Sequence, residues 1–165
     1  MTVKYIKYLA IIVVLVLIQK TLIWLISLSS LNITPDLVLI MVVYISISEG
    51  KVFGSVTGFL AGLTIDLISG SFLGLMALSY SITGFVAGLF NSEGNKNLSK
   101  INFLVIIFLC SIVSNLVYYV IYFQGLALNF FEIFSKYILT TSTYTTIVSI
   151  VYIIFPGKKA LKEGY

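Results

Sequence analysis

The chain has 165 residues, of which 59% are hydrophobic and 10% are charged, and its formal net charge is +4. A typical soluble domain carries about 25% charged residues, so this composition excludes a soluble globular protein and predicts an all-α, polytopic membrane protein. The basic residues are all lysine and are scattered along the chain, which argues against a nucleic-acid partner. The sequence contains no histidine and a single cysteine, so we expect no metal site, no cofactor and no internal disulfide.

Apolar runs separated by short polar segments predict six transmembrane helices in one membrane domain. We place these spans at about residues 5–29, 35–48, 51–68, 72–90, 101–123 and 130–155. The first is expected to be an uncleaved span, because its apolar run is longer than the roughly 7–15 residues of a signal-peptide core. Pro35 is expected to start the second span, with Thr34 as its N-cap. That span is short, so it is either a half-span or runs almost continuously into the third.

A stripe of glycines marks the third span. Glycines recur there at every fourth residue, at Gly50, Gly54, Gly58 and Gly62. The fourth span carries small residues on one helical face, including Gly84 and Gly88. Small residues at this spacing allow two helix backbones to approach closely in a membrane. We therefore expect the two spans to pack as a hairpin; the alternative is that the stripe binds a transmembrane helix of another protein.

The lysines predict the orientation of the chain in the membrane. With six spans, the side that holds both termini carries Lys4, Lys7, Lys51, Lys96, Lys100, Lys158, Lys159 and Lys162. The loops of the opposite side, around residues 30–34, 69–71 and 124–129, contain no lysine. Because cytoplasmic loops are enriched in lysine and arginine, both termini are expected to be cytoplasmic.

Several charged residues fall in the outer half of the membrane in this orientation. An ionised side chain at the bilayer centre costs about 2.5–3.5 kcal/mol on insertion scales, and such residues usually pair. We therefore predict that Asp36 and Asp66 pair with Lys20 and Lys136 and tie the spans together. The alternatives are that each lysine extends to the outer headgroups with the acids at the interface, which we favour for Glu132, or that the charges line an ion pathway.

The sequence offers no catalytic constellation. Its serines have no histidine partner, and the glycine repeat lies in an apolar helix, where a phosphate-binding loop is not expected. The hydroxyl-rich run from Thr140 to Thr146 either lines a ligand cavity or bonds to carbonyl groups of its own or a neighbouring helix. We therefore expect a protein that is not an enzyme.

Motifs between about residues 35 and 90 match one known family in order and spacing. Pro35-Asp36-Leu37 opens the second span, Glu49-Gly50 forms the next junction, and the glycine helix ends in the segment from Leu63 to Gly70. This pattern resembles the bacterial rod shape-determining protein MreD family. The family positions that carry over are Pro35, Asp36, Glu49, Gly50, Asp66 and Gly70.

The resemblance implies a non-enzymatic component of the cell-elongation complex in the bacterial inner membrane. Such a protein acts with MreC in a complex that connects MreB filaments to peptidoglycan synthases. The resemblance also implies a fold similar to the substrate-binding subunits of energy-coupling-factor transporters. The alternative function is therefore a small-molecule-binding subunit of a transporter. A pocket of roughly 300 Å³ or more would favour a ligand, and a closed, salt-bridged core would favour a scaffold.

Overall fold

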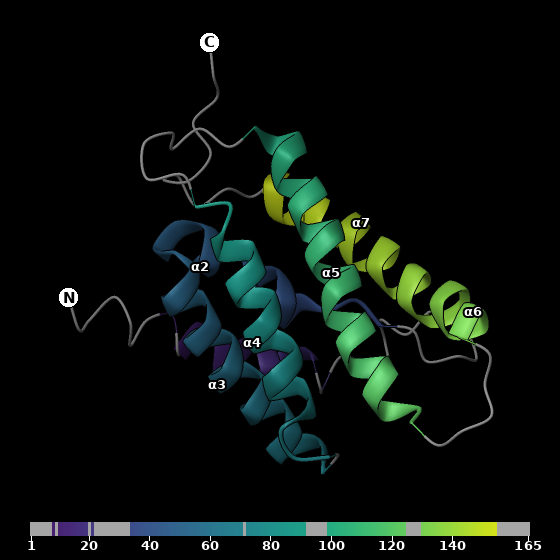
Figure 1. Cartoon of the computed structure of the whole chain (residues 1–165). Coiled ribbons are helices and arrows are strands. Elements are labelled where there is room, and N and C mark those ends of the chain that lie inside the picture. Colours follow the sequence, from purple (N-terminus) through teal and green to yellow (C-terminus); the bar gives the residue numbers. More distant parts are fainter. Residues whose placement is uncertain are drawn as a thin grey trace.

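The computed structural model describes residues 8, 10–19, 21, 34–70, 72–91, 99–124 and 130–154, with the last four described by their backbone. The described residues form the helical segment Ala10–Gln19, then α2 (Leu37–Glu49), α3 (Lys51–Ser69), α4 (Leu75–Gly88), α5 (Lys100–Tyr122), α6 (Phe130–Ile133), the π-helical turn η1 (Phe134–Leu139) and α7 (Thr140–Ile154). The predicted all-α fold class is confirmed for this part of the chain. Figure 1 shows α4 between α3 on one side and α5 on the other.

The helix at the centre of the bundle is α2. It packs against α3, α4, α5 and α7, and eight of its 13 residues are buried. Val38, Val42 and Val43 are completely buried. A helix that is apolar on all sides is expected in such a position, and the run from Leu37 to Val43 has no polar face. Thirteen residues rise about 20 Å, which is less than the hydrocarbon thickness of a bilayer.

An acidic residue begins α2, and a single glycine ends it. Its N-cap is Asp36, whose carboxylate accepts a hydrogen bond from the backbone N–H of Leu39 at 3.0 Å. The predicted cap, Thr34, was therefore wrong, and Pro35 precedes the helix. An acidic cap is favourable because the helix N-terminus carries a partial positive charge. At the other end, Gly50 alone separates α2 from α3, with a φ of 92° that residues with a side chain rarely adopt.

The helices α3 and α4 form the hairpin that the small-residue pattern predicts. Gly70 ends α3 in the left-handed conformation, and its N–H donates to the carbonyl oxygen of Asp66 at 3.1 Å. The helix α4 starts at Leu75, three residues later than the predicted span. The two helices run antiparallel and side by side (Figure 1), because Gly88 at the end of α4 lies against Lys51 at the start of α3.

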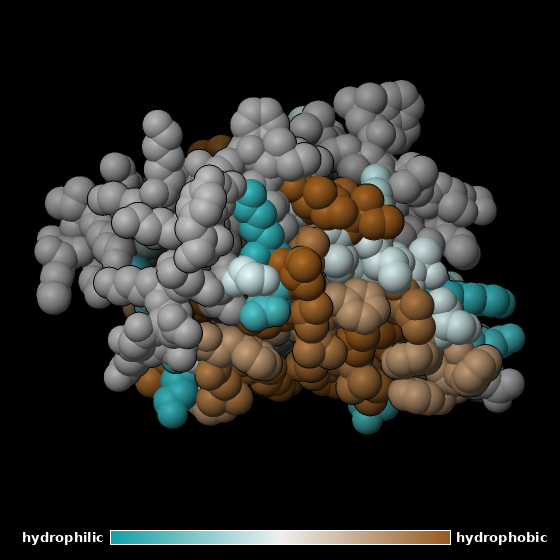
Figure 2. Space-filling view, turned by 90° about the horizontal axis from the view of Figure 1, so that it is seen from above, coloured by the Kyte–Doolittle hydropathy of each residue, from teal (hydrophilic) through white to brown (hydrophobic). Residues whose placement is uncertain are grey.

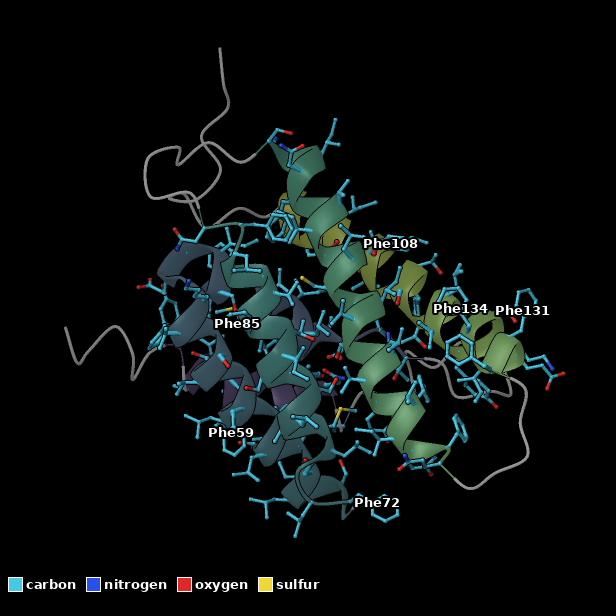
Figure 3. All side chains as sticks on the ribbon, viewed as in Figure 1. Phe59, Phe72, Phe85, Phe108, Phe131 and Phe134 are labelled. Atoms are coloured by element: carbon cyan, nitrogen blue, oxygen red, sulfur yellow. The ribbon has the colours of Figure 1, made fainter. Side chains whose placement is uncertain are left out.

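Large apolar side chains cover the outside of the bundle. Val52, Phe72, Ile101 and Phe131 are between 70% and 79% exposed, and Figure 2 shows hydrophobic side chains gathered along one side of the molecule. Soluble monomers rarely expose apolar patches larger than a few hundred Å². Among the described helices, α3 with 19 residues and α5 with 23 are long and apolar enough to cross a membrane. This surface therefore suits a lipid environment.

Candidate functional site

The glycine stripe of α3 lies in the contact with α4. A Cβ atom added at Gly54, Gly58 or Gly62 would come within 3.0 Å of atoms in α2 or α4, a distance that real Cβ atoms essentially never show. At Gly58 the nearest atom is the backbone carbonyl oxygen of Tyr80, and at Gly62 it is that of Met76. Because backbone atoms cannot rotate away, these positions have room for glycine and for nothing larger.

The glycines of α4 make the matching half of this contact. A Cβ atom at Gly84 or Gly88 would also come within 3.0 Å of the backbone of α3 or the residue before it. Gly50 differs, since the nearest atom to an added Cβ is the Asn91 amide nitrogen at 3.6 Å, and it is the positive φ that requires glycine there. The predicted stripe is thus placed inside the chain, where α4 covers the side of α3 that another protein's helix would need.

Asp66 caps a helix to which it does not belong. It lies in the last turn of α3 and is completely buried. Its carboxylate accepts hydrogen bonds from the backbone N–H groups of Gly74 at 2.9 Å, Met76 at 3.2 Å and Ala77 at 3.2 Å. These groups open α4, and N–H groups in a first helical turn have no partner within their own helix. The positive end of α4 also favours a negative charge, so Asp66 holds the two helices of the hairpin together.

Asp36 joins three helices. Besides capping α2, its carboxylate accepts a hydrogen bond from the hydroxyl group of Tyr80 in α4 at 2.5 Å. Its own backbone N–H donates to the Thr145 hydroxyl oxygen in α7 at 3.1 Å. The residue that begins α2 is therefore fixed by α4 and α7 at once, and α2 cannot slide along its axis without breaking these bonds.

Lys136, one of the two lysines predicted to pair with these acids, is placed differently. The Nζ atom of Lys136, in η1, lies 4.0 Å from the carboxylate of Glu132, and both side chains are more than half exposed. This pairing corrects the predicted ion pair of Lys136 with an aspartate. The Asp66 carboxylate instead accepts hydrogen bonds from backbone N–H groups, while Lys20 lies outside the described residues. Exposed pairs four residues apart contribute little to stability.

A polar cavity of about 180 Å³ lies where six segments of the chain meet. Its lining residues are Val16, Gln19, Thr34, Asp36, Ile65, Met76, Tyr80, Asn115, Tyr118, Tyr119 and Thr141. Beside the cavity, the helix Ala10–Gln19 is bonded to α2, because the Gln19 side-chain oxygen accepts a hydrogen bond from the N–H of Val38 at 3.2 Å. The volume is smaller than the roughly 300 Å³ at the lower end of ordinary small-molecule pockets.

Hydroxyl groups connect the remaining helices near this cavity. The Ser79 and Ser114 hydroxyl oxygens lie 2.9 Å apart across α4 and α5. The Asn115 amide donates to the hydroxyl groups of Ser111 at 3.3 Å and Ser142 at 3.2 Å, which connects α5 with α7. The hydroxyl-rich run of α7 is therefore used for contacts between helices, and one of its members, Thr141, lines the cavity.

Almost the whole chain matches one protein family. The family described as "rod shape-determining protein MreD" matches residues 2–156 of the 165. The chain belongs to the MreD family. No curated protein and no solved structure matches it. MreD proteins are shape-determining membrane proteins, so a role in determining rod shape is supported for this chain.

The described part of this MreD-family chain contains functional candidates that the sequence did not single out. Tyr80 stands on the small-residue face of α4 and donates to Asp36, while Asn115 in α5 donates to Ser142 in α7. A polar residue within an apolar span was the available signal, since such a side chain needs a partner in lipid. The sequence alone did not reveal which helix supplies that partner.

We expect Tyr80→Phe to destabilise this MreD-family chain by about 1.5 kcal/mol, because it removes a hydrogen bond to a carboxylate and changes little else. Thermal unfolding of the detergent-purified chain measures the effect. Tyr122→Phe at the end of α5, where the side chain is 43% exposed, is the matched control for loss of a hydroxyl group. Equal stability of Tyr80→Phe and the wild type would show that the bond to Asp36 contributes nothing.

Proposed function

We propose that this chain is a multi-pass, non-enzymatic scaffold of the bacterial cell-elongation machinery in the inner membrane. The observation that carries the proposal is the family match over residues 2–156. The chain binds MreC and, with other membrane proteins of the elongation complex and MreB, helps to control peptidoglycan synthesis and rod shape. A fold with six spans, similar to the substrate-binding subunits of energy-coupling-factor transporters, is part of the same proposal.

The use of polar groups inside the bundle supports a scaffold. Asp66 fixes the start of α4, and Asp36 fixes the start of α2. Ser79 and Ser114 join α4 to α5 at 2.9 Å. A bundle whose helix ends are held in this way presents constant outer surfaces to partner helices. The cavity volume of about 180 Å³ also favours this function over the binding of a vitamin-sized transport substrate.

The positions of two lysines support the proposed orientation. Lys51 starts α3 and lies against Gly88 at the end of α4. The ring of Phe72, just before α4, lies 6.4 Å from that of Tyr122 at the end of α5. The helix α5 therefore also runs antiparallel to α4, and Lys100 at its start lies at the same end of the bundle as Lys51. A shared basic end agrees with a cytoplasmic location for the lysine-rich loops and both termini.

Purification of the tagged chain from its own cells in mild detergent, followed by mass spectrometry, tests the scaffold proposal. We expect MreC and peptidoglycan synthases to be recovered with it. The control is a tagged, unrelated multi-pass protein expressed at the same level, which should recover neither. Recovery of an ATPase module or a bound vitamin-like molecule in place of these partners would contradict the proposal.

Crosslinking then tests whether a partner helix binds the lipid-facing side of α3 or its buried side. The single cysteine, Cys110, is buried, so a Cys110→Ala background allows new cysteines to be placed one at a time. We expect crosslinks to MreC from cysteines at lipid-facing positions, such as Val56 and Phe59, which are 52% and 46% exposed. A cysteine at Thr57, which is buried on the same helix, should give none.

A further inference from the structure

The polar cavity has the charge of a cation site. Among its described lining residues Asp36 is the one acid, and none is a lysine. The Asp36 carboxylate is bonded to the Tyr80 hydroxyl and the Leu39 N–H, which are both neutral donors. The N-terminus of α2 offsets about half of a unit charge, so the described lining residues carry a net negative charge when Asp36 is ionised. Because a charge screened from bulk water interacts strongly with other charges, the cavity attracts a cation and repels an anion such as phosphate.

Two tyrosine rings give the cavity the shape of an aromatic corner. The rings of Tyr118 and Tyr119 have centroids 5.2 Å apart and stand at 86° to each other. Both residues line the cavity, as does Tyr80. The face of an aromatic ring attracts cations within about 6 Å, and sets of such rings recognise organic ammonium ions. The ring of Tyr118 is also stacked on that of Tyr122, and the ring of Tyr119 on that of Phe123, so an ammonium group in the cavity contacts at most one face of each ring.

Asn115 supplies an acceptor to the same cavity. Its amide nitrogen donates to the hydroxyl groups of Ser111 and Ser142. Within the described part of the chain its carbonyl oxygen accepts no hydrogen bond, and Asn115 is one of the lining residues. An ammonium or hydroxyl group in the cavity can donate to this oxygen.

The volume limits the kind of cation. A cavity of about 150 Å³ holds benzene, so a volume of about 180 Å³ fits an ion with about six to eight non-hydrogen atoms. A Ca²⁺ site needs about six to eight oxygen ligands, usually with several carboxylates, whereas this cavity has one. A bare Na⁺ ion would leave most of the space and the aromatic walls without contact.

We propose that this cavity binds a small organic ammonium ion, primary or quaternary, up to about the size of choline. Asp36 supplies the charge, the rings of Tyr80, Tyr118 and Tyr119 form the walls, and Asn115 accepts a hydrogen bond. The binding of this ion is independent of the scaffold function, and it does not require that the chain transports anything.

Thermal unfolding of the full chain in detergent, titrated with choline chloride and with ethanolamine hydrochloride at constant ionic strength, tests the proposal. We expect at least one of the two to raise Tm saturably, by about 3 °C at concentrations well above its Kd. The neutral analogues, 3,3-dimethyl-1-butanol and ethylene glycol, should leave Tm unchanged, as should NaCl. An equal rise with the neutral analogues or with NaCl, or no rise with either ammonium compound, would overturn the proposal.

Variants assign the binding to this cavity. Asp36→Asn keeps a side chain that caps helices well and should weaken ammonium binding by at least about tenfold. Tyr118→Leu removes one wall and should weaken it by about fivefold, so the proposal stays testable if Asp36→Asn folds poorly. Glu132→Gln removes an exposed carboxylate outside the cavity and should bind as the wild type does. Unchanged binding in Tyr118→Leu would contradict the assignment.

The ammonium group has two possible sources, a free amine and an amine-bearing lipid headgroup. Nanodiscs made of phosphatidylglycerol alone, or with phosphatidylethanolamine, distinguish them. A rise in Tm with the second lipid that is lost in Asp36→Asn identifies the headgroup, and a rise with free ethanolamine in the first identifies the soluble amine. Either result supports an ammonium site, and the absence of both, together with no response to choline, overturns it.

Discussion

Asp66→Ala is expected to lower the free energy of unfolding by about 4 kcal/mol or more. The substitution leaves the N–H groups of Gly74, Met76 and Ala77 without their acceptor. Asp66 is completely buried, so water cannot replace the carboxylate. The start of α4 would then have to loosen, and the hairpin with it. Size-exclusion chromatography and thermal unfolding of the detergent-purified chain measure the loss.

Two further variants make the Asp66 result specific. Asp66→Asn keeps one acceptor oxygen and should have intermediate stability. Glu132→Gln neutralises a carboxylate that is about half exposed and should change stability by less than about 0.5 kcal/mol. If Asp66→Ala is as stable as Glu132→Gln, Asp66 does not cap α4.

The second large effect is expected at Gly58, with a sign opposite to that of helix propensity. Alanine is favoured over glycine by about 1 kcal/mol within a helix. At this position, however, its Cβ would lie within 3.0 Å of the Tyr80 backbone carbonyl, and α3 and α4 would have to separate. We expect Gly58→Ala to destabilise the chain by about 2 kcal/mol and Gly58→Leu to prevent the hairpin from forming, as judged by thermal unfolding in detergent.

The control for Gly58 lies two residues earlier on the same helix. Val56 is 52% exposed, so Val56→Leu adds bulk toward the surroundings and should leave stability within about 0.5 kcal/mol of the wild type. A Gly58→Ala chain that is at least as stable as the wild type would contradict the close approach of Gly58 to the Tyr80 carbonyl group.

The α3–α4 hairpin could be predicted from the sequence because its cause is local and periodic. Glycines at Gly54, Gly58 and Gly62 on one span, and small residues on the next, define two faces that fit together. Adjacent spans joined by a short turn have few other ways to pack. The centrality of α2 was readable in principle, since the run from Leu37 to Val43 has no polar side. The shortness of this span instead favoured a half-span or a continuous run into the third span.

The partner of Asp66 could not be obtained from pairing rules. A buried charge needs compensation, and a lysine is the usual choice, but the structure uses the N-terminus of α4. A signal was present, because Phe72, Leu73 and Gly74, which precede α4, offer no side-chain acceptor to cap it. The pair of Lys136 with Glu132 was also visible, since four residues separate them along a helix. The bond from Tyr80 to Asp36 spans 44 residues and depends on tertiary packing.

The shortness of the enclosed helix α2 has a consequence for how the chain is made. Its thirteen residues are too few to be held in a bilayer as an independent span, which needs about 20. Only Gly50 separates α2 from α3, so the two helices reach the membrane together during synthesis. The hydrogen bonds that fix Asp36 come from α4 and α7, which emerge from the ribosome later. The central helix α2 is therefore synthesised early, but the hydrogen bonds that fix its position form only after α4 and α7 have been made.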